Sequence, residues 1–177
     1  MVGYENGPET RPATVLVPAV ANAPKSLRVA VDLRTVAYAD SSARGIGHYT
    51  THHLAAIARR APDVRLCCHL PTDGELPAAL QLPNVTARHV DDFVAAECDL
   101  VHLPDPMNLA LGFDSPLRVF RHLRTTVTFH DLTPLRHYLD TWPDRTQVAY
   151  RDRLEQIRRS DALLLCNSRF TADDAVA

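Results

Sequence analysis

The stretch Arg28-Val29-Ala30-Val31-Asp32-Leu33, "RVAVDL", decides the fold of this 177-residue chain. It is short, almost continuously apolar and rich in valine, a pattern typical of a strand that is buried on both faces of a sheet. Further stretches repeat this character at residues 64–70, 85–90, 100–103, 126–129 and 162–166. The sequence therefore predicts a sheet of buried strands.

Helical patterns separate some of these strands. One helix has an apolar face made of Ile46, Tyr49, Leu54 and Ile57. A second has a face made of Val148, Tyr150, Leu154 and Ile157. Both run into a pair of arginines, which suits the carboxyl end of a helix. Thr171 and Asp174 resemble a capping box that opens a third helix. Alternating strands and helices predict an α/β fold, with a Rossmann-like, mainly parallel sheet and helices on both faces.

Residues 1–27 differ from the rest of the chain. Four prolines are spaced through them, at positions 8, 12, 18 and 24, and no periodicity is sustained. Prolines at this density block a helix and disfavour a paired strand. We therefore expect a Pro-rich N-terminal extension at residues 1–27 and a single domain at residues 28–177, with Val15-Leu16-Val17 as a patch that could dock on it.

Composition excludes several function classes. A formal net charge of −2 argues against nucleic acid as a partner, because binding phosphates requires a clear basic excess. No apolar run approaches the roughly 20 residues of a membrane span. Four cysteines without a C-x-x-C pair indicate reduced core residues. These observations predict a cytoplasmic protein, and the single lysine, Lys25, among basic residues that are otherwise arginine hints at a bacterial source.

Ligands of parallel α/β sheets bind at the carboxyl ends of the strands. The first strand is followed by a loop that ends in Gly45-Ile46-Gly47 at the start of a helix. Free backbone N–H groups there, with no Cβ at two positions, suit a phosphate. The alternative is a tight loop-to-helix turn with no ligand. The third glycine of the dinucleotide fingerprint is missing, which weakens the case for an NAD site.

The stretch "TVTFHDLTPL" places a titratable pair, His130 and Asp131, where a strand should stop. A histidine can donate to a ligand hydroxyl or phosphate, and the neighbouring carboxylate can fix its orientation. The alternative is a histidine with a purely structural role beside an aspartate that caps a turn before Pro134.

Three further groups of residues are site candidates. Asp105 and Asn108 follow the fourth strand, and His48 and Tyr49 follow the glycine loop. His48 and His52 have a spacing that could hold zinc, but no third ligand is evident, so we expect no metal. Trp142-Pro143 suggests loop packing, although an aromatic ring can also stack on a sugar.

Four segments in order resemble the N-terminal domain of the family-four retaining glycosyltransferases, which have the GT-B fold. They are "RVAVDLRTV…ARGIGHYTTHHLAAIA", "DLVHLPDPMN", "TVTFHDLTPL" and "SDALLLCNSRFTADD". The resemblance covers residues 28–177.

This resemblance implies a role for each segment. The chain would be the acceptor-binding half of an enzyme that transfers a hexosyl group, with retention, from a nucleotide-diphosphate sugar to an acceptor hydroxyl. Gly45, Ile46 and Gly47 would lie near the donor pyrophosphate. His130, supported by Asp131, would approach the transferred sugar. Ser168 and Arg169, with Asn167, match a turn near the cleft.

The resemblance also sets expectations about partners. We expect a sugar donor as co-substrate, no tightly bound cofactor, and a small-molecule, glycan or lipid-linked acceptor. The nucleotide-sugar domain of the family is absent from these residues, so it would be supplied in cis or in trans, and the isolated chain would be inactive. A noncatalytic Rossmann-like binding or interaction module is the alternative.

A basic stripe would form if the segment that contains Arg118, Arg121 and Arg124 were helical. Such a stripe would suit an anionic acceptor or a membrane surface. A solvated helix face is the preferred interpretation.

Overall fold

The computed structural model describes residues 26–37, 45–71, 74–109, 116–120 and 122–176. The expected N-terminal extension lies outside the described residues except for Ser26 and Leu27, and so does the apolar patch within it.

The strands form one six-stranded sheet in the order β3-β2-β1-β4-β5-β6, and every adjacent pair is parallel. Their bounds are β1 Leu27–Asp32, β2 Val64–Leu70, β3 Val85–His89, β4 Leu100–Leu103, β5 Arg124–Phe129 and β6 Leu163–Cys166. The chain builds outward from β1 through β2 to β3 and then returns to the other side of β1 with β4. The predicted α/β, Rossmann-like fold is confirmed, and the strand order reverses between β1 and β4.

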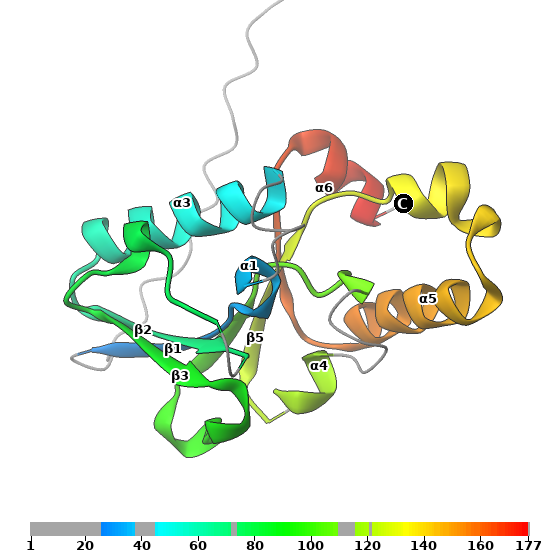
Figure 1. Cartoon of the computed structure of the whole chain (residues 1–177). Coiled ribbons are helices and arrows are strands. Elements are labelled where there is room, and N and C mark those ends of the chain that lie inside the picture. The colour runs from blue at the N-terminus through cyan, green and yellow to red at the C-terminus, as the bar shows by residue number, and fades with distance from the viewer. Residues whose placement is uncertain (1–25, 38–44, 72–73, 110–115, 121, 177) are drawn as a thin grey trace, which may run out of the picture.

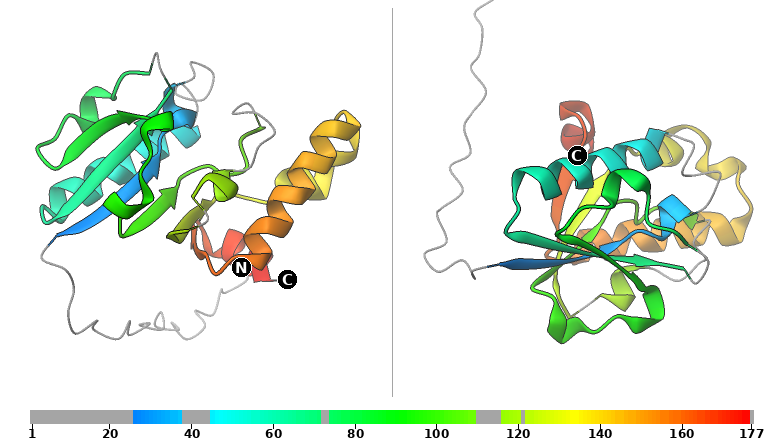
Figure 2. Two further views of the ribbon diagram at one scale, coloured as in Figure 1. Left: turned by 90° about the horizontal axis from the view of Figure 1, so that it is seen from below. Right: turned by 60° about the vertical axis from the view of Figure 1, so that its left-hand side comes forward.

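Helices cover both faces of this sheet (Figures 1 and 2). Their bounds are α1 Arg34–Ala37, α3 Gly45–Arg60, α4 Pro116–Val119, α5 Asp144–Arg159 and α6 Arg169–Val176. Short helical turns lie at η1 Ala78–Leu80, η2 Val90–Asp92, η3 Ala95–Glu97, η5 Pro134–Tyr138 and η6 Leu139–Thr141. Val29 and Val31 of β1 belong to the core under α3, while Ala30 belongs to a second core with Phe120 and Ile157. Alternate residues of β1 therefore face different helical layers, as the continuous apolar run predicts.

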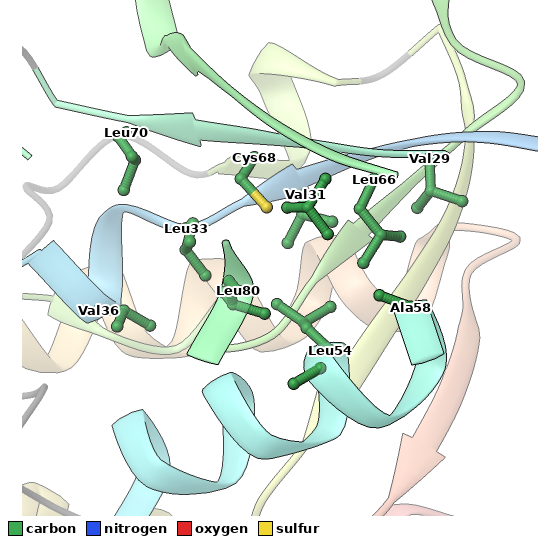
Figure 3. Close-up of a cluster of buried hydrophobic side chains, with 12 residues drawn as sticks. Val29, Val31, Leu33, Val36, Leu54, Ala58, Leu66, Cys68, Leu70 and Leu80 are labelled. Carbon is green, nitrogen blue, oxygen red and sulfur yellow. The ribbon is translucent and has the colours of Figure 1, made fainter. Parts of the chain in front are cut away.

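The core under α3 is drawn in Figure 3. Leu54 of α3, 1% exposed, lies against Val31 and Leu66 of the sheet. Burying such a side chain contributes about 1.5–3 kcal/mol relative to leaving it in water.

The buried face of α3 differs from the predicted one. Its buried residues are Gly47, Thr50, Leu54, Ala55 and Ala58. The side chains of Ile46, Tyr49 and Ile57 are only half-buried. Small residues let the helix axis approach the sheet closely, and a search for large apolar side chains does not detect such a face.

The amphipathic pattern of α5 also needs correction. Val148, predicted on the apolar face, is 67% exposed, whereas Arg153 is 1% exposed. Tyr150, Arg153 and Ile157 form the buried stripe of this helix.

The predicted start of the third helix was wrong, and the condition for the basic stripe is not met. Thr171 does not open α6, because the helix begins at Arg169 and the Ser168 hydroxyl accepts a hydrogen bond from the Thr171 amide at 3.0 Å. The basic stripe does not form on one helix, because α4 ends at Val119 and Arg124 begins β5. Arg121 lies outside the described residues.

Candidate functional site

The carboxyl ends of β1, β4, β5 and β6 meet at one edge of the sheet because the strands are parallel. Asp32 ends β1, Asp105 lies two residues past β4, His130 directly follows β5, and Ser168 lies just past β6. Ligands of such sheets bind at this edge, near the point where strand order reverses. The residues singled out from the sequence therefore lie at the edge expected to carry a site.

His130 is held by groups from three other segments. Its Nε2–H donates to the carbonyl oxygen of Pro104, at 2.9 Å. Its own carbonyl oxygen accepts from the Thr171 hydroxyl, at 3.0 Å. The Tyr49 ring meets the imidazole edge-on, with ring centroids 5.5 Å apart. Because Nε2 carries the proton that is donated to Pro104, the neutral ring has its free lone pair on Nδ1.

Asp131 does not orient His130, contrary to the sequence-based expectation. Its Oδ1 accepts from the backbone amide of Thr133, at 2.9 Å. Within the described residues, no hydrogen bond or ion pair joins Asp131 to the His130 side chain. The orienting group is the Pro104 carbonyl, and Asp131 instead caps the turn before Pro134, as the structural alternative predicted.

Asp105 is buried at the same edge, with 8% exposure. Burial raises the pKa of its carboxyl group, while the positive charge that His130 can carry and a hydrogen bond from the Asn108 side chain oppose that shift. The loop behind Asp105 is held by Arg153, whose Nη1 donates to the carbonyl oxygens of Pro106, at 3.0 Å, and Asn108, at 2.8 Å.

Sequence reasoning missed Arg153, since an arginine in an amphipathic helix is normally assigned to the solvated face. Its position, three residues after Tyr150 and four before Ile157, was the available signal.

A cavity of about 620 Å³ opens at this edge. Among the site candidates named from the sequence, seven line it: Ile46, Asp105, Asn108, His130, Asp131, Trp142 and Pro143. Ile46 comes from the first turn of α3, so the glycine segment and the His130-Asp131 pair border the same space. Three aromatic residues, Tyr138, Trp142 and Tyr150, also line the cavity and are called its aromatic wall below.

The remaining site candidates lie close by without lining this cavity. Gly47 lies on the buried face of α3, and His48 is exposed. Tyr49 contacts the His130 ring. Ser168 caps α6, and Arg169 is exposed in its first turn. Among the described residues, a Cβ added at Gly45 would meet no heavy atom within 4 Å beyond its own helix.

A hydrogen-bonded histidine lies beneath this edge, between α3 and the sheet. The Nδ1 of His102 lies 3.0 Å from the Thr126 hydroxyl, which itself donates to the Val101 carbonyl, so the Nδ1 must be the donor to Thr126. Its Nε2 lies 3.4 Å from the Thr128 hydroxyl and is left to accept. Burial, and secondarily the charge of His53, lowers the pKa of His102 to about 4. This network is complete with a neutral imidazole.

A larger cavity, of about 920 Å³, lies at the opposite ends of the strands. Arg28, Arg65 and Arg88 line it, but Arg28 pairs with Asp99 and Arg88 pairs with Glu97. It contains none of the residues that follow the strands at their carboxyl ends. We therefore assign the candidate site to the smaller cavity.

Across the described ranges, no group of three or more His, Cys, Asp or Glu side chains could hold a metal ion. His48 and His52 stack with ring centroids 6.3 Å apart. All four cysteines are free thiols, and Cys68 is buried. No helix in the described part of the chain has the length and apolarity needed to cross a bilayer.

The fold and the cavity define an α/β protein with a Rossmann-like sheet and a ligand-sized space at its carboxyl edge. No protein-family model matches the sequence, and no curated protein matches it. Among solved structures, a wide-type short-chain dehydrogenase/reductase from Veillonella parvula DSM 2008, in complex with NADP, is similar at 11% identity with a TM-score of 0.46. The likeness covers 80% of this chain and 67% of that chain. Similarity at this level says nothing about the ligand of the present site.

Proposed function

We propose that this chain is the acceptor-side half of a retaining glycosyltransferase that uses a nucleotide-diphosphate sugar. One observation carries the proposal: the first turn of α3, the His130 imidazole and the buried Asp105 carboxyl border one cavity. The sequence resemblance had assigned the first two of these to the donor pyrophosphate and the transferred sugar. Their meeting at a single space supports that assignment.

In this proposal, the acceptor hydroxyl attacks the anomeric carbon of the donor while the bond from that carbon to the diphosphate oxygen breaks. The hydroxyl proton passes to the departing diphosphate. Charge develops on the leaving diphosphate, and the N–H groups in the first turn of α3 are suited to stabilise it. His130 contributes a ring fixed through Nε2, which leaves the Nδ1 edge for a substrate. A further domain, in the same polypeptide or a partner, holds the nucleotide. The reaction takes place in the cytoplasm without a metal.

The test uses the protein expressed from its whole reading frame, together with any partner encoded beside it. Product formation is followed by mass spectrometry with a panel of nucleotide-diphosphate sugars and sugar acceptors. His130→Gln is the informative variant, because the Gln amide nitrogen can replace Nε2 as the donor to Pro104 while the imidazole is lost. We expect turnover to fall about 10²-fold or more, with little change in melting temperature.

His52→Gln is the matched control, since His52 is exposed on α3 and does not line the cavity. It should keep full turnover. Absence of transfer and of nucleotide release with every donor would refute the proposal and leave the noncatalytic module. Equal losses of turnover and folding in His130→Gln would make His130 structural.

A further inference from the structure

The lining of the cavity contains two chemically different sets of groups. One is polar and supplies the Asp105 and Asp131 carboxyl groups with the Asn108 amide. The other consists of the rings of Tyr138, Trp142 and Tyr150. A carboxyl group has oxygens that accept hydrogen bonds in either protonation state, so these groups match ligand hydroxyls that donate. Aromatic faces match the apolar C–H faces of a ring.

The aromatic wall is braced before any ligand arrives. Trp142 lies between two tyrosines: its ring centroid is 5.7 Å from that of Tyr138 and 5.7 Å from that of Tyr150, which meets it edge-on. The Trp142 carbonyl accepts from the Gln147 side chain, at 2.9 Å, and the Tyr138 carbonyl accepts from the Thr141 hydroxyl, at 2.7 Å. Figure 2 shows the turns that carry this wall, in yellow, beside the start of α5. A preformed wall lowers the entropic cost of binding.

Exposure along the wall is graded. Tyr138 is 40% exposed, Trp142 is half-buried and Tyr150 is 2% exposed. Tyr138 and Trp142 therefore have surface for a ligand, and Tyr150 supports Trp142 from behind. The turn that presents Tyr138, η5, is a π-helical turn, a geometry frequent at functional sites.

The carboxyl groups of the lining disfavour an anionic group beside them. Two carboxyl groups line the cavity, and among the described residues that line it there is no lysine or arginine. The imidazole of His130 is the one lining group there that can become cationic. A phosphate group placed beside Asp105 and Asp131 would meet like charge, whereas an uncharged group there would not. The diphosphate of the proposed donor lies instead at the first turn of α3.

We propose that the cavity binds an uncharged pyranose ring, stacked on Tyr138 and Trp142 with its hydroxyls hydrogen-bonded to Asp105, Asn108 and Asp131. This inference rests on the proposed function in treating the cavity as a substrate site, and it narrows the acceptor to a neutral sugar, excluding one recognised through a phosphate. The cavity volume of about 620 Å³ lies within the range of small-molecule sites.

Trp142 is the only tryptophan of the chain, so its fluorescence reports on this wall. The experiment titrates the chain with the methyl pyranosides of glucose, mannose and galactose. Sorbitol serves as an open-chain polyol and glucose 6-phosphate as an anionic ring, and saturation-transfer NMR detects binding independently. We expect saturable binding of at least one pyranoside, with sorbitol and glucose 6-phosphate weaker by about tenfold or more. The inference would be overturned if none of the three pyranosides bound. It would also be overturned if sorbitol or glucose 6-phosphate bound as tightly as the best pyranoside.

Variants of Tyr138 test the wall itself. Tyr138→Ala should weaken the pyranoside by about tenfold in the NMR assay, and Tyr138→Phe, which keeps the ring, should bind like the parent chain. Leu135→Ala is the matched control, because Leu135 is 36% exposed in the same turn and does not line the cavity. An unchanged affinity in Tyr138→Ala would remove the stacking role and overturn the inference.

The outcomes separate this inference from the proposed function. Free sugar binds without a donor or a second domain, so transfer activity in the whole protein without pyranoside binding here would overturn the inference alone. Pyranoside binding without any transfer would refute the proposed function alone.

Discussion

The buried His102 should make the stability of the fold depend on pH. Burial lowers the pKa of His102 from 6.5 to about 4, and its neutral ring is fully hydrogen-bonded between Thr126 and Thr128. Between these two pH values the His102 side chain is protonated in the unfolded chain and neutral in the folded chain. The free energy of unfolding therefore falls as the pH is lowered through this window.

The size of the effect follows from the two pKa values. Linkage gives a loss attributable to His102 of about 0.8 kcal/mol at pH 6, about 2 kcal/mol at pH 5 and about 3 kcal/mol at pH 4, relative to pH 7.5 and above. Other groups titrate in the same range. Burial also lowers the pKa of His53 and His69, and the raised pKa of Asp105 acts in the opposite sense.

A substitution isolates the contribution of His102. In His102→Asn the amide can still donate toward Thr126, but nothing titrates, while the other groups remain in both proteins. Urea unfolding at pH 7.5, 6 and 5, followed by circular dichroism, gives the two free energies. At pH 7.5 the variant should be less stable by about 1–2 kcal/mol, since a ring and a hydrogen bond are lost. That difference should shrink by about 2 kcal/mol at pH 5.

His52→Asn, on the exposed face of α3, is the control and should keep a constant difference from the parent. A difference between parent and His102→Asn that stays within about 0.5 kcal/mol from pH 7.5 to pH 5 would refute the reasoning, because the His102 pKa would then be the same in both states.

Three further substitutions have defined outcomes. Arg153→Met should lower the free energy of unfolding by about 2–5 kcal/mol, because two buried carbonyl oxygens lose a charged donor; a loss below about 1 kcal/mol in urea would contradict the role of Arg153. Asn84→Ala should cost about 1–2 kcal/mol, since the Asn84 amide donates to the carbonyl oxygens of Ala58, at 3.0 Å, and Val64, at 2.8 Å, and joins α3 to β2; an unchanged melting temperature would show that these bonds add nothing. Gly45→Ala should leave stability equal or raised by up to about 1 kcal/mol, because its Cβ meets nothing and alanine favours a helix; a clear loss in the thermal melt would count against the open space beside Gly45.

The strands could be predicted from the sequence because most of them contain a short run of apolar or β-branched residues. β2 and β4 occupy the predicted residues, and the largest error is at β5, which begins at Arg124 rather than Thr126. The polar residues Arg124 and Thr125 at its start give no apolar signal. The buried face of α3 was placed wrongly for a related reason, since Gly47, Ala55 and Ala58 pack by being small.

The candidate site could be predicted only in part. The positions of His130 and Asp105 follow from where strands end. The group that orients His130 is the backbone carbonyl of Pro104. Every residue has a backbone carbonyl, so this contact could not be predicted from residue types. The aromatic wall depends on how the turns after β5 fold back, which no periodic pattern encodes.

The central position of β1 has a consequence during synthesis. One edge of β1 pairs with β2, which follows closely in the chain, and the other pairs with β4, which is made only after β3. At about 5–20 residues per second, a ribosome needs several seconds to pass from the end of β1 to the start of β4. During that interval one edge of the apolar strand β1 has no native partner. Any other extended segment nearby can compete with β4 for pairing with this edge. The step most exposed to chaperones and to misassembly is therefore the arrival of Leu100–Leu103 beside Val29–Val31.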